Sequence, residues 1–196
     1  MSEHSYLSRS KITRCIWKSP LGPLGLVSRG GKLAQIMFPV DPVSFPFAVE
    51  RTFGSAGKES LEPFAEITKQ LGEYFEGRRL VFRFPMDLDQ GTPFQRRVWK
   101  ALADIPYGQT MSYKEIAKNI GQPSATRAVG SANGMNPLPI VIPCHRVVSS
   151  DGSLGGYTPG LAAKKKLLGL EAETRAKAAR HGILIDYNKP QSRIGF

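Results

Sequence analysis

Residues 111–136 read MSYKEIAKNIGQPSATRAVGSANGMN, and they contain two short helical patterns separated by a tight turn. Ser112 and Glu115, three residues later, match a capping box, so a first helix is expected to begin there and to end near Gly121. After the Gln-Pro turn, Ser124 is expected to cap a second helix. Two short helices joined by such a turn predict a helix-turn-helix.

The second of these helices is expected to expose short side chains and a single long one, Arg127. Such a surface is typical of tight packing against another helix, but it also lets a backbone lie very close to a nucleic acid groove. The chain carries 27 Lys and Arg against 16 Asp and Glu, a net charge of +11. A basic surface suits a polyanion such as nucleic acid, and an anionic membrane would also attract it. The short residues are Ala125, Thr126, Ala128, Val129, Gly130, Ser131 and Ala132.

The N-terminal half has the pattern of a small antiparallel sheet. Between Lys11 and Phe38, short β-prone runs are separated by Gly-Pro and Gly-Gly dipeptides, which are typical of turns. The segment PVDPVSFPFAV, residues 39–49, is rich in Pro and Phe and is expected to be an irregular connection. Apolar residues then recur at helical spacing over residues 60–77, which predicts an amphipathic helix that covers the sheet.

The pattern changes around the stretch MDLDQGTP, where we place a domain boundary. A helix is expected to begin at Thr92, and LAAKKKLLGLE, residues 161–171, predicts a last helix. We therefore predict an α+β protein. Its N-terminal domain is a small antiparallel sheet with helical cover over residues 1–90, and its second domain, over residues 91–172, is mostly helical and winged-helix-like. Residues 173–196 form a tail.

Two features of the expected last helix differ in what they indicate. Lys164–Lys166 form a charged face that is most simply solvated. Glu171 instead shares its helix face with Leu167 and Leu168, where a carboxylate requires a compensating donor. An exposed, frayed helix end is the alternative explanation for Glu171.

The cysteine and histidine content argues against a metal site. Cys15 and Cys144 are expected to be thiols, because an intracellular protein normally keeps its cysteines reduced. No Cys-x-x-Cys or His-x-x-x-His pairing exists among two Cys and three His. No stretch approaches the ~20 apolar residues of a membrane-spanning helix, and the N-terminus lacks the apolar segment of a secretory signal. We expect a cytoplasmic protein, or a nuclear one if the source is eukaryotic.

The segment PIVIPCHRVV, residues 139–148, places Cys144 directly before a histidine. A cysteine within an apolar strand is usually a small core residue. However, His145 and Arg146 follow at once, and basic neighbours favour the reactive thiolate. Because neighbouring residues of a strand point to opposite faces, His145 would reach the thiol only through a water or if Pro143 breaks the strand.

Two kinds of enzyme could use this thiol. A Cys-His hydrolase would need an orienting residue, for which Asn136 is available, but that function leaves the basic helix-turn-helix unexplained. An enzyme that acts on a nucleobase explains both features, because the base must be turned out of the stack and into a pocket that holds the reactive group. The order of the motifs favours the second kind.

Residues 91–171 closely resemble the C-terminal domain of the O6-alkylguanine-DNA alkyltransferases, or methylated-DNA–protein-cysteine methyltransferases. PCHRV, at residues 143–147, is the signature of that family, and its long flanks match too. Residues 11–85 resemble the family's N-terminal domain more weakly. Some relatives hold zinc in that domain, but this chain lacks the Cys/His cluster, so the resemblance implies neither a metal nor another cofactor.

The resemblance implies a catalytic role for five residues. Cys144 would accept the alkyl group from O6 of guanine, His145 would act as its base through a water, and Glu171 would orient His145. Asn136 would brace the turn that carries the cysteine. Tyr113 would crowd the 3′ phosphate, which drives rotation of the nucleotide, and would give a proton to the guanine ring.

The resemblance also implies contacts with double-stranded DNA through its minor groove. Arg127 would enter the base stack in place of the flipped nucleotide. The expected pocket residues are Pro139, Val147, Tyr157 and Thr158. The expected DNA contacts, besides Tyr113 and Arg127, are Lys114, Gln122, Ala125, Thr126, Gly130 and Ser150.

The implied reaction is stoichiometric repair of O6-alkylguanine, and O4-alkylthymine is a second potential substrate. The product would be a thioether that no neighbouring group is placed to hydrolyse, so each molecule would act once. A monomer is expected, and clustering on DNA is left open. The alternatives are a non-catalytic protein that binds the alkylguanine lesion and a helix-turn-helix transcription regulator.

Overall fold

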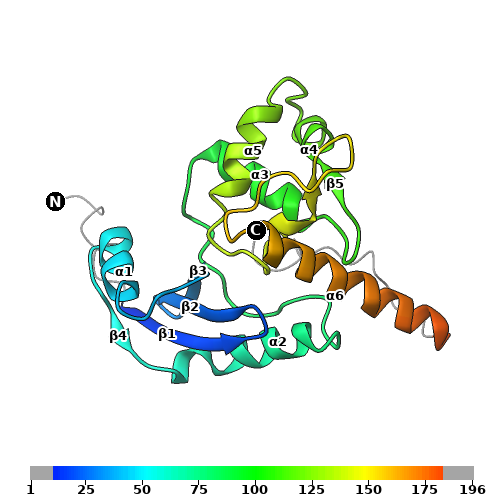
Figure 1. Cartoon of the computed structure of the whole chain (residues 1–196). Coiled ribbons are helices and arrows are strands. Elements are labelled where there is room, and N and C mark those ends of the chain that lie inside the picture. Colours follow the sequence, from blue (N-terminus) through cyan, green and yellow to red (C-terminus); the bar gives the residue numbers. More distant parts are fainter. Residues whose placement is uncertain (1–10, 183–196) are drawn as a thin grey trace.

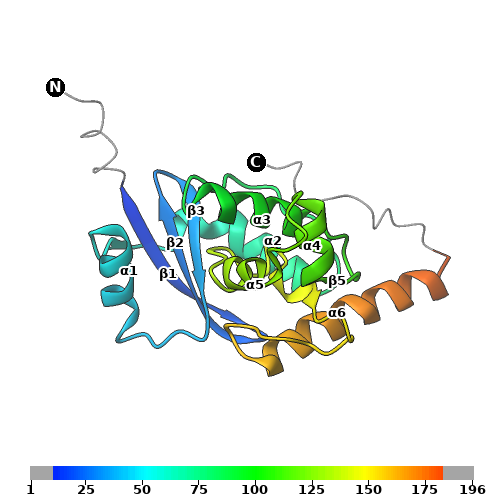
Figure 2. The same cartoon turned by 90° about the horizontal axis from the view of Figure 1, so that it is seen from above.

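The computed structural model describes residues 11–182 and has the expected α+β architecture (Figures 1 and 2). Three antiparallel strands, β1 (Ile12–Ser19), β2 (Gly22–Arg29) and β3 (Lys32–Met37), follow one another through tight turns. The short β4 (Lys58–Glu59) joins β1 in parallel, so the order is β3-β2-β1-β4. The predicted antiparallel sheet and its Gly-Gly turn are confirmed. The Gly-Pro turn is wrong, because Gly22 and Pro23 begin β2 and the chain turns at Pro20 and Leu21 instead.

Helices cover both faces of this sheet. Alternate residues of β2 point to opposite faces of the sheet, so its side chains pack into two separate cores. Leu24 and Leu26 belong to the core shared with α2 (Ala65–Phe75), which is preceded by a 3-10 turn, η3 (Glu62–Phe64). Val27 belongs to a second core with α1 (Phe45–Phe53).

Helix α1 corrects the expectation that residues 39–49 are irregular. Pro46 lies in the first turn of this helix, where a missing backbone N–H has no cost, and Phe45 and Val49 bury the same helix face. The prolines made this segment resemble a loop, so the helix that begins within it was not predicted from the sequence.

The C-terminal part is mostly helical and lies above the sheet in Figure 1. It begins with α3 (Pro93–Ala103), followed by β5 (Met111–Ser112), α4 (Tyr113–Asn119) and α5 (Thr126–Gly134). After a 3-10 turn, η4 (Cys144–Arg146), comes β6 (Val147–Val148), which pairs in parallel with β5. The last helix is α6 (Leu161–Arg180).

The helix-turn-helix begins as predicted and continues differently. Ser112 and Glu115 form the reciprocal hydrogen bonds of a capping box at the start of α4. The expected cap at Ser124 is wrong, because Ala125 is the N-cap residue of α5. The turn between α4 and α5 is therefore one residue longer than predicted.

Helix α6 also extends beyond its expected end at Glu171. Thr174 and Ala178 lie on the same face as Glu171 and are buried, and the Oγ1 of Thr174 lies against Gly77 after α2. Beyond Glu171 the buried face of α6 is made of small side chains and no large apolar ones, so the apolar period of the sequence ends before the helix does. Residues 183–196 of the expected tail lie outside the described residues. None of the described helices is long and apolar enough to cross a membrane.

Candidate active site

The segment around Cys144 forms a braced turn, which corrects the expectation of strand-like structure. The amide Nδ2 of Asn136 donates to the carbonyl of Ile142 at 2.8 Å, and its Oδ1 accepts from the backbone N–H of Leu138 at 3.0 Å. Between them Ile140 has a φ of 78°, which is strained for a β-branched residue. Asn136 thus holds a turn that places the thiol at the start of η4.

Replacing Asn136 by alanine is expected to lower the free energy of unfolding by about 1–3 kcal/mol, because the N–H of the buried Leu138 loses its partner and the carbonyl of Ile142 loses one of its two donors. Urea-induced unfolding measures this loss. Asn119→Ala, at the exposed end of α4, is the matched control and should change stability by less than about 0.5 kcal/mol. Equal stability of the Asn136 variant and the control would contradict the bracing role.

The thiol of Cys144 lies at a cavity of about 660 Å³ whose walls come from both parts of the chain. Only 3% of this residue is exposed. Burial raises the pKa of Cys144 to about 11, although the Asn136 amide and the charge of Lys164 partly oppose that rise. The thiol therefore needs a base to react at neutral pH. The N-terminal wall is formed by Gln35, Ile36, Met37, Phe38, Pro39 and Gln90.

His145 is fully buried beside Cys144 and is held by Glu171. Its Nε2 lies 2.9 Å from Oε1 of Glu171, so this nitrogen donates to the carboxylate. Its Nδ1 is buried and has no hydrogen-bond partner within residues 11–182. Burial lowers the pKa of His145 despite the opposing charge of Glu171. At neutral pH, Nδ1 thus offers a free lone pair on the residue that directly follows the thiol.

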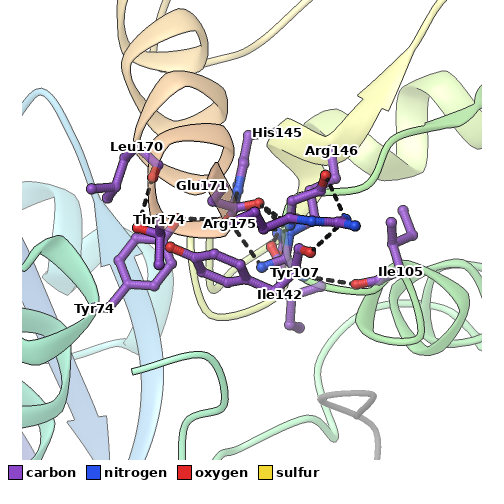
Figure 3. A network of polar contacts seen from close by, with 12 residues as sticks. Tyr74, Ile105, Tyr107, Ile142, His145, Arg146, Leu170, Glu171, Thr174 and Arg175 are labelled. Atoms are coloured by element: carbon purple, nitrogen blue, oxygen red, sulfur yellow. Dashed lines mark hydrogen bonds and ion pairs between the residues drawn. The ribbon is translucent and has the colours of Figure 1, made fainter. Parts of the chain in front are cut away.

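The carboxylate of Glu171 is the centre of a buried network (Figure 3). The guanidinium of Arg146 donates from Nε to Oε2 and from Nη2 to Oε1, both at 3.0 Å. The backbone N–H of Gly108 donates to Oε2, and the hydroxyl of Tyr74 donates to Oε1, each at 2.8 Å. Burial opposes ionisation, but His145 and Arg146 hold the pKa of Glu171 well below its ordinary value. Glu171 is therefore a charged residue inside the protein and not a frayed helix end.

Sequence reasoning missed several residues of this site. Arg146 was considered only as a neighbour of the thiol, whereas its buried side chain binds Glu171 and the carbonyl of Ile105. The expected solvated face at Lys164–Lys166 is wrong for its first residue, because Lys164 is fully buried. Its ammonium donates to the carbonyls of Val147 and Leu154, which ties α6 to the segment after the thiol.

Three of the four expected pocket residues, Pro139, Tyr157 and Thr158, line the other wall of the cavity, whereas Val147 is fully buried and is not one of the lining residues. The hydroxyl of Tyr113 donates to the carbonyl of Gly156 at 3.4 Å, and Thr158 donates to the carbonyl of Gly134 at 3.1 Å. The hydroxyl of Tyr157 is buried and has no partner in the described part of the chain. The structure thus brings both tyrosines and the thiol to one cavity.

Two family models match successive parts of the chain. Residues 12–88 match the ribonuclease-like domain of 6-O-methylguanine DNA methyltransferase, and residues 93–173 match its DNA-binding domain. A methylated-DNA–protein-cysteine methyltransferase of Mycolicibacterium paratuberculosis is 48% identical over 153 residues, which cover 78% of this chain and 88% of that protein. The chain belongs to the 6-O-methylguanine DNA methyltransferase family.

A further relative and two solved structures are similar too. The methylated-DNA–protein-cysteine methyltransferase of Methanosarcina acetivorans is 43% identical over 80% of this chain and 96% of its own length. The crystal structure of Mycobacterium tuberculosis OGT in complex with DNA has a TM-score of 0.72 and 41% identity, covering 84% of this chain and 94% of that chain. The O6-methylguanine-DNA methyltransferase structure from Pyrococcus kodakaraensis has a TM-score of 0.59 and 25% identity, covering 82% and 98%.

In this member of the 6-O-methylguanine DNA methyltransferase family, the expected DNA-contacting residues lie on α4, α5 and the loops beside them. Arg127 is exposed in the first turn of α5, and Lys114 is exposed in the first turn of α4. Gly130 lies close to the ring of Tyr113, where a Cβ would come within 3.9 Å. Gln122 and Ser150 are also exposed, whereas Ala125 and Thr126 are half-buried at the start of α5.

Proposed function

We propose that this protein repairs double-stranded DNA by moving the alkyl group of an O6-alkylguanine onto Sγ of Cys144, once per molecule. The observation that carries the proposal is the buried thiol at the cavity, next to a neutral histidine whose Nδ1 is free. The DNA-bound structure of a relative supports DNA as the partner. The names of the closely similar relatives support the same chemistry.

The proposed reaction is a direct displacement. A water relays the thiol proton of Cys144 to Nδ1 of His145, and Glu171 stabilises the imidazolium that forms through its contact with Nε2. Sulfur then bonds to the alkyl carbon as the bond from that carbon to guanine O6 breaks. Tyr113 gives its hydroxyl proton to the guanine ring, which neutralises the leaving group. The proton that His145 accepted then replaces the one lost by Tyr113 through solvent, so the net change moves the thiol proton to guanine. The product is a thioether on Cys144 and an unmodified guanine.

The cavity selects the nucleobase through protein groups that approach the polar edge of that nucleobase. Tyr157 brings a buried hydroxyl that has no partner among the described residues, so it is free to donate to the base. Backbone groups of Val147 and Thr158 recognise guanine, and Pro139 covers it.

The helix-turn-helix presents the lesion to this cavity. Helix α5 enters the minor groove, Tyr113 crowds the 3′ phosphate, and Arg127 fills the place of the flipped nucleotide. Residues 1–90 and 91–172 act as two domains of a monomer, and the protein works where DNA is, in the cytoplasm or a nucleus. The further contacts are Lys114, Gln122, Ala125, Thr126, Gly130 and Ser150.

Affinity for duplex DNA is expected to fall steeply with added salt, because each neutralised phosphate adds about −0.9 to the slope of log affinity against log salt concentration. Fluorescence anisotropy with a labelled duplex between 50 and 200 mM salt measures the slope. A slope near zero would contradict an electrostatic encounter through the basic surface.

A duplex that carries one O6-methylguanine tests the function. With excess protein, every lesion is expected to return to guanine, and with excess DNA, the number of repaired lesions should equal the number of protein molecules. Cys144→Ser should bind the same duplex without repairing it. Tight binding with an unchanged lesion in the wild type would instead support the alternative, a protein that only binds alkylguanine.

A further inference from the structure

We propose that Tyr74, on α2 of the N-terminal part, is a positioning residue of the alkyl-transfer site, because its hydroxyl holds the Glu171 carboxylate in place for His145. This inference rests on the proposed function, since it concerns the base of that reaction. It gives the sheet part of the molecule a role in the chemistry besides forming a wall of the cavity.

The first observation is a direct contact between the two parts of the chain. The hydroxyl of Tyr74 donates to Oε1 of Glu171 at 2.8 Å, and the same oxygen accepts Nε2 of His145 at 2.9 Å. All three side chains are fully buried. Figure 3 shows Tyr74 and Arg146 on opposite sides of Glu171, so the carboxylate is held from both sides.

The second observation is that the ring of Tyr74 is fixed by other aromatic rings. Phe75, Phe82 and Tyr107 have their ring centroids 5.4, 5.5 and 6.0 Å from that of Tyr74. A hydroxyl on a rigid ring restricts the carboxylate more than one on a mobile side chain would, because little side-chain freedom remains. Glu171 has three rotatable side-chain bonds, so it benefits from such a constraint.

The hydroxyl also affects the charge that His145 senses. Burial and the charge of Glu171 raise the pKa of Tyr74 well above its ordinary value, so it stays a donor throughout the working pH range. Without this donor, Oε1 would accept more strongly from His145 and stabilise the imidazolium, which raises the pKa of His145. Tyr74 therefore helps keep the base neutral. The titratable or charged groups around His145 are Cys144, Arg146, Lys164, Glu171 and Tyr74.

Tyr74→Phe removes the hydroxyl and keeps the ring. Single-turnover repair of an O6-methylguanine duplex is expected to slow about threefold to tenfold at pH 7, because the Glu171 carboxylate loses the hydrogen bond that holds it in place for His145. In the wild type the base is neutral at pH 7, and activity falls as the pH drops through the lowered pKa of His145. In the variant that fall should begin at higher pH. NMR titration of the His145 ring should show the same upward shift of its pKa.

Phe45→Leu is the matched control, because it opens the second core, which Tyr74 does not share, and leaves the Tyr74 ring and hydroxyl in place. It should lower the melting temperature without moving the His145 titration. An unchanged His145 titration in Tyr74→Phe, or an equal shift in Phe45→Leu, would overturn the positioning role. Failure of the wild type to repair the duplex would refute the proposed function instead, and the His145 titration would still decide whether the Tyr74 hydroxyl acts on the base.

Discussion

Replacing Glu171 by alanine is expected to lower the free energy of unfolding by about 3–5 kcal/mol, because the guanidinium of Arg146 would remain buried without its counter-ion. Arg146 is only 2% exposed, and Glu171 is fully buried. The same change also removes the acceptors of Tyr74 and Gly108. Such a loss is a large part of the stability of an ordinary domain.

Urea-induced unfolding at pH 7 measures this effect, and Glu173→Ala is its matched control. Glu173 lies two residues further on α6, is exposed, and carries the same charge. Its replacement should change stability by less than about 0.5 kcal/mol. Equal losses in the two variants would contradict the buried network.

The pH dependence of this difference follows from the lowered pKa of Glu171. The stabilisation is fully present above the ordinary Glu pKa of about 4.3, and it is lost as the pH falls through the lower pKa of the folded state. The gap between wild type and Glu171→Ala should therefore be as large at pH 5.5 as at pH 7. It should narrow only in stronger acid.

Arg127→Ala is expected to slow repair of duplex DNA by roughly 30- to 100-fold. Without the arginine, no side chain fills the gap that the flipped nucleotide leaves in the base stack, so the free energy cost of flipping, a few kcal/mol, is not offset. Reaction with free O6-benzylguanine should stay near the wild-type rate, because a free base needs no flipping. Single-turnover rates on the two substrates measure the difference.

Arg51→Ala removes the same charge from exposed α1, which lies far from α5 in Figure 1, and serves as the control. It should leave both rates nearly unchanged. Equal losses of Arg127→Ala on duplex and free base would contradict a role in the base stack.

The sequence predicted those elements whose signals are local. The capping box at Ser112 and Glu115 and the Gly30-Gly31 turn of the sheet depend on residues a few positions apart, and both are found in the structure. The start of α1 was missed because its prolines resemble those of a loop. The end of α6 was missed because Ala178 and its neighbours are too small to produce an apolar period.

The site was predicted only in part, for a similar reason. The residue pattern drew attention to Cys144, His145 and Glu171, the resemblance to the alkyltransferases linked them, and the structure places Glu171 against His145. The Tyr74 donor to Glu171 could not be found from sequence spacing, since it lies 97 positions away on another element. A run of lysines likewise gives no sign that Lys164 turns inward to backbone carbonyls.

The most direct test of the account is the mass of the peptide that carries Cys144, measured after the protein has reacted with a duplex containing O6-methylguanine. We predict that this peptide gains one methylene unit in every reacted molecule. The peptide with Cys15, a buried β1 thiol whose pKa burial raises to about 12, should stay unmodified. An unchanged Cys144 peptide, alongside a repaired lesion or a methyl group on another residue, would contradict the central claim.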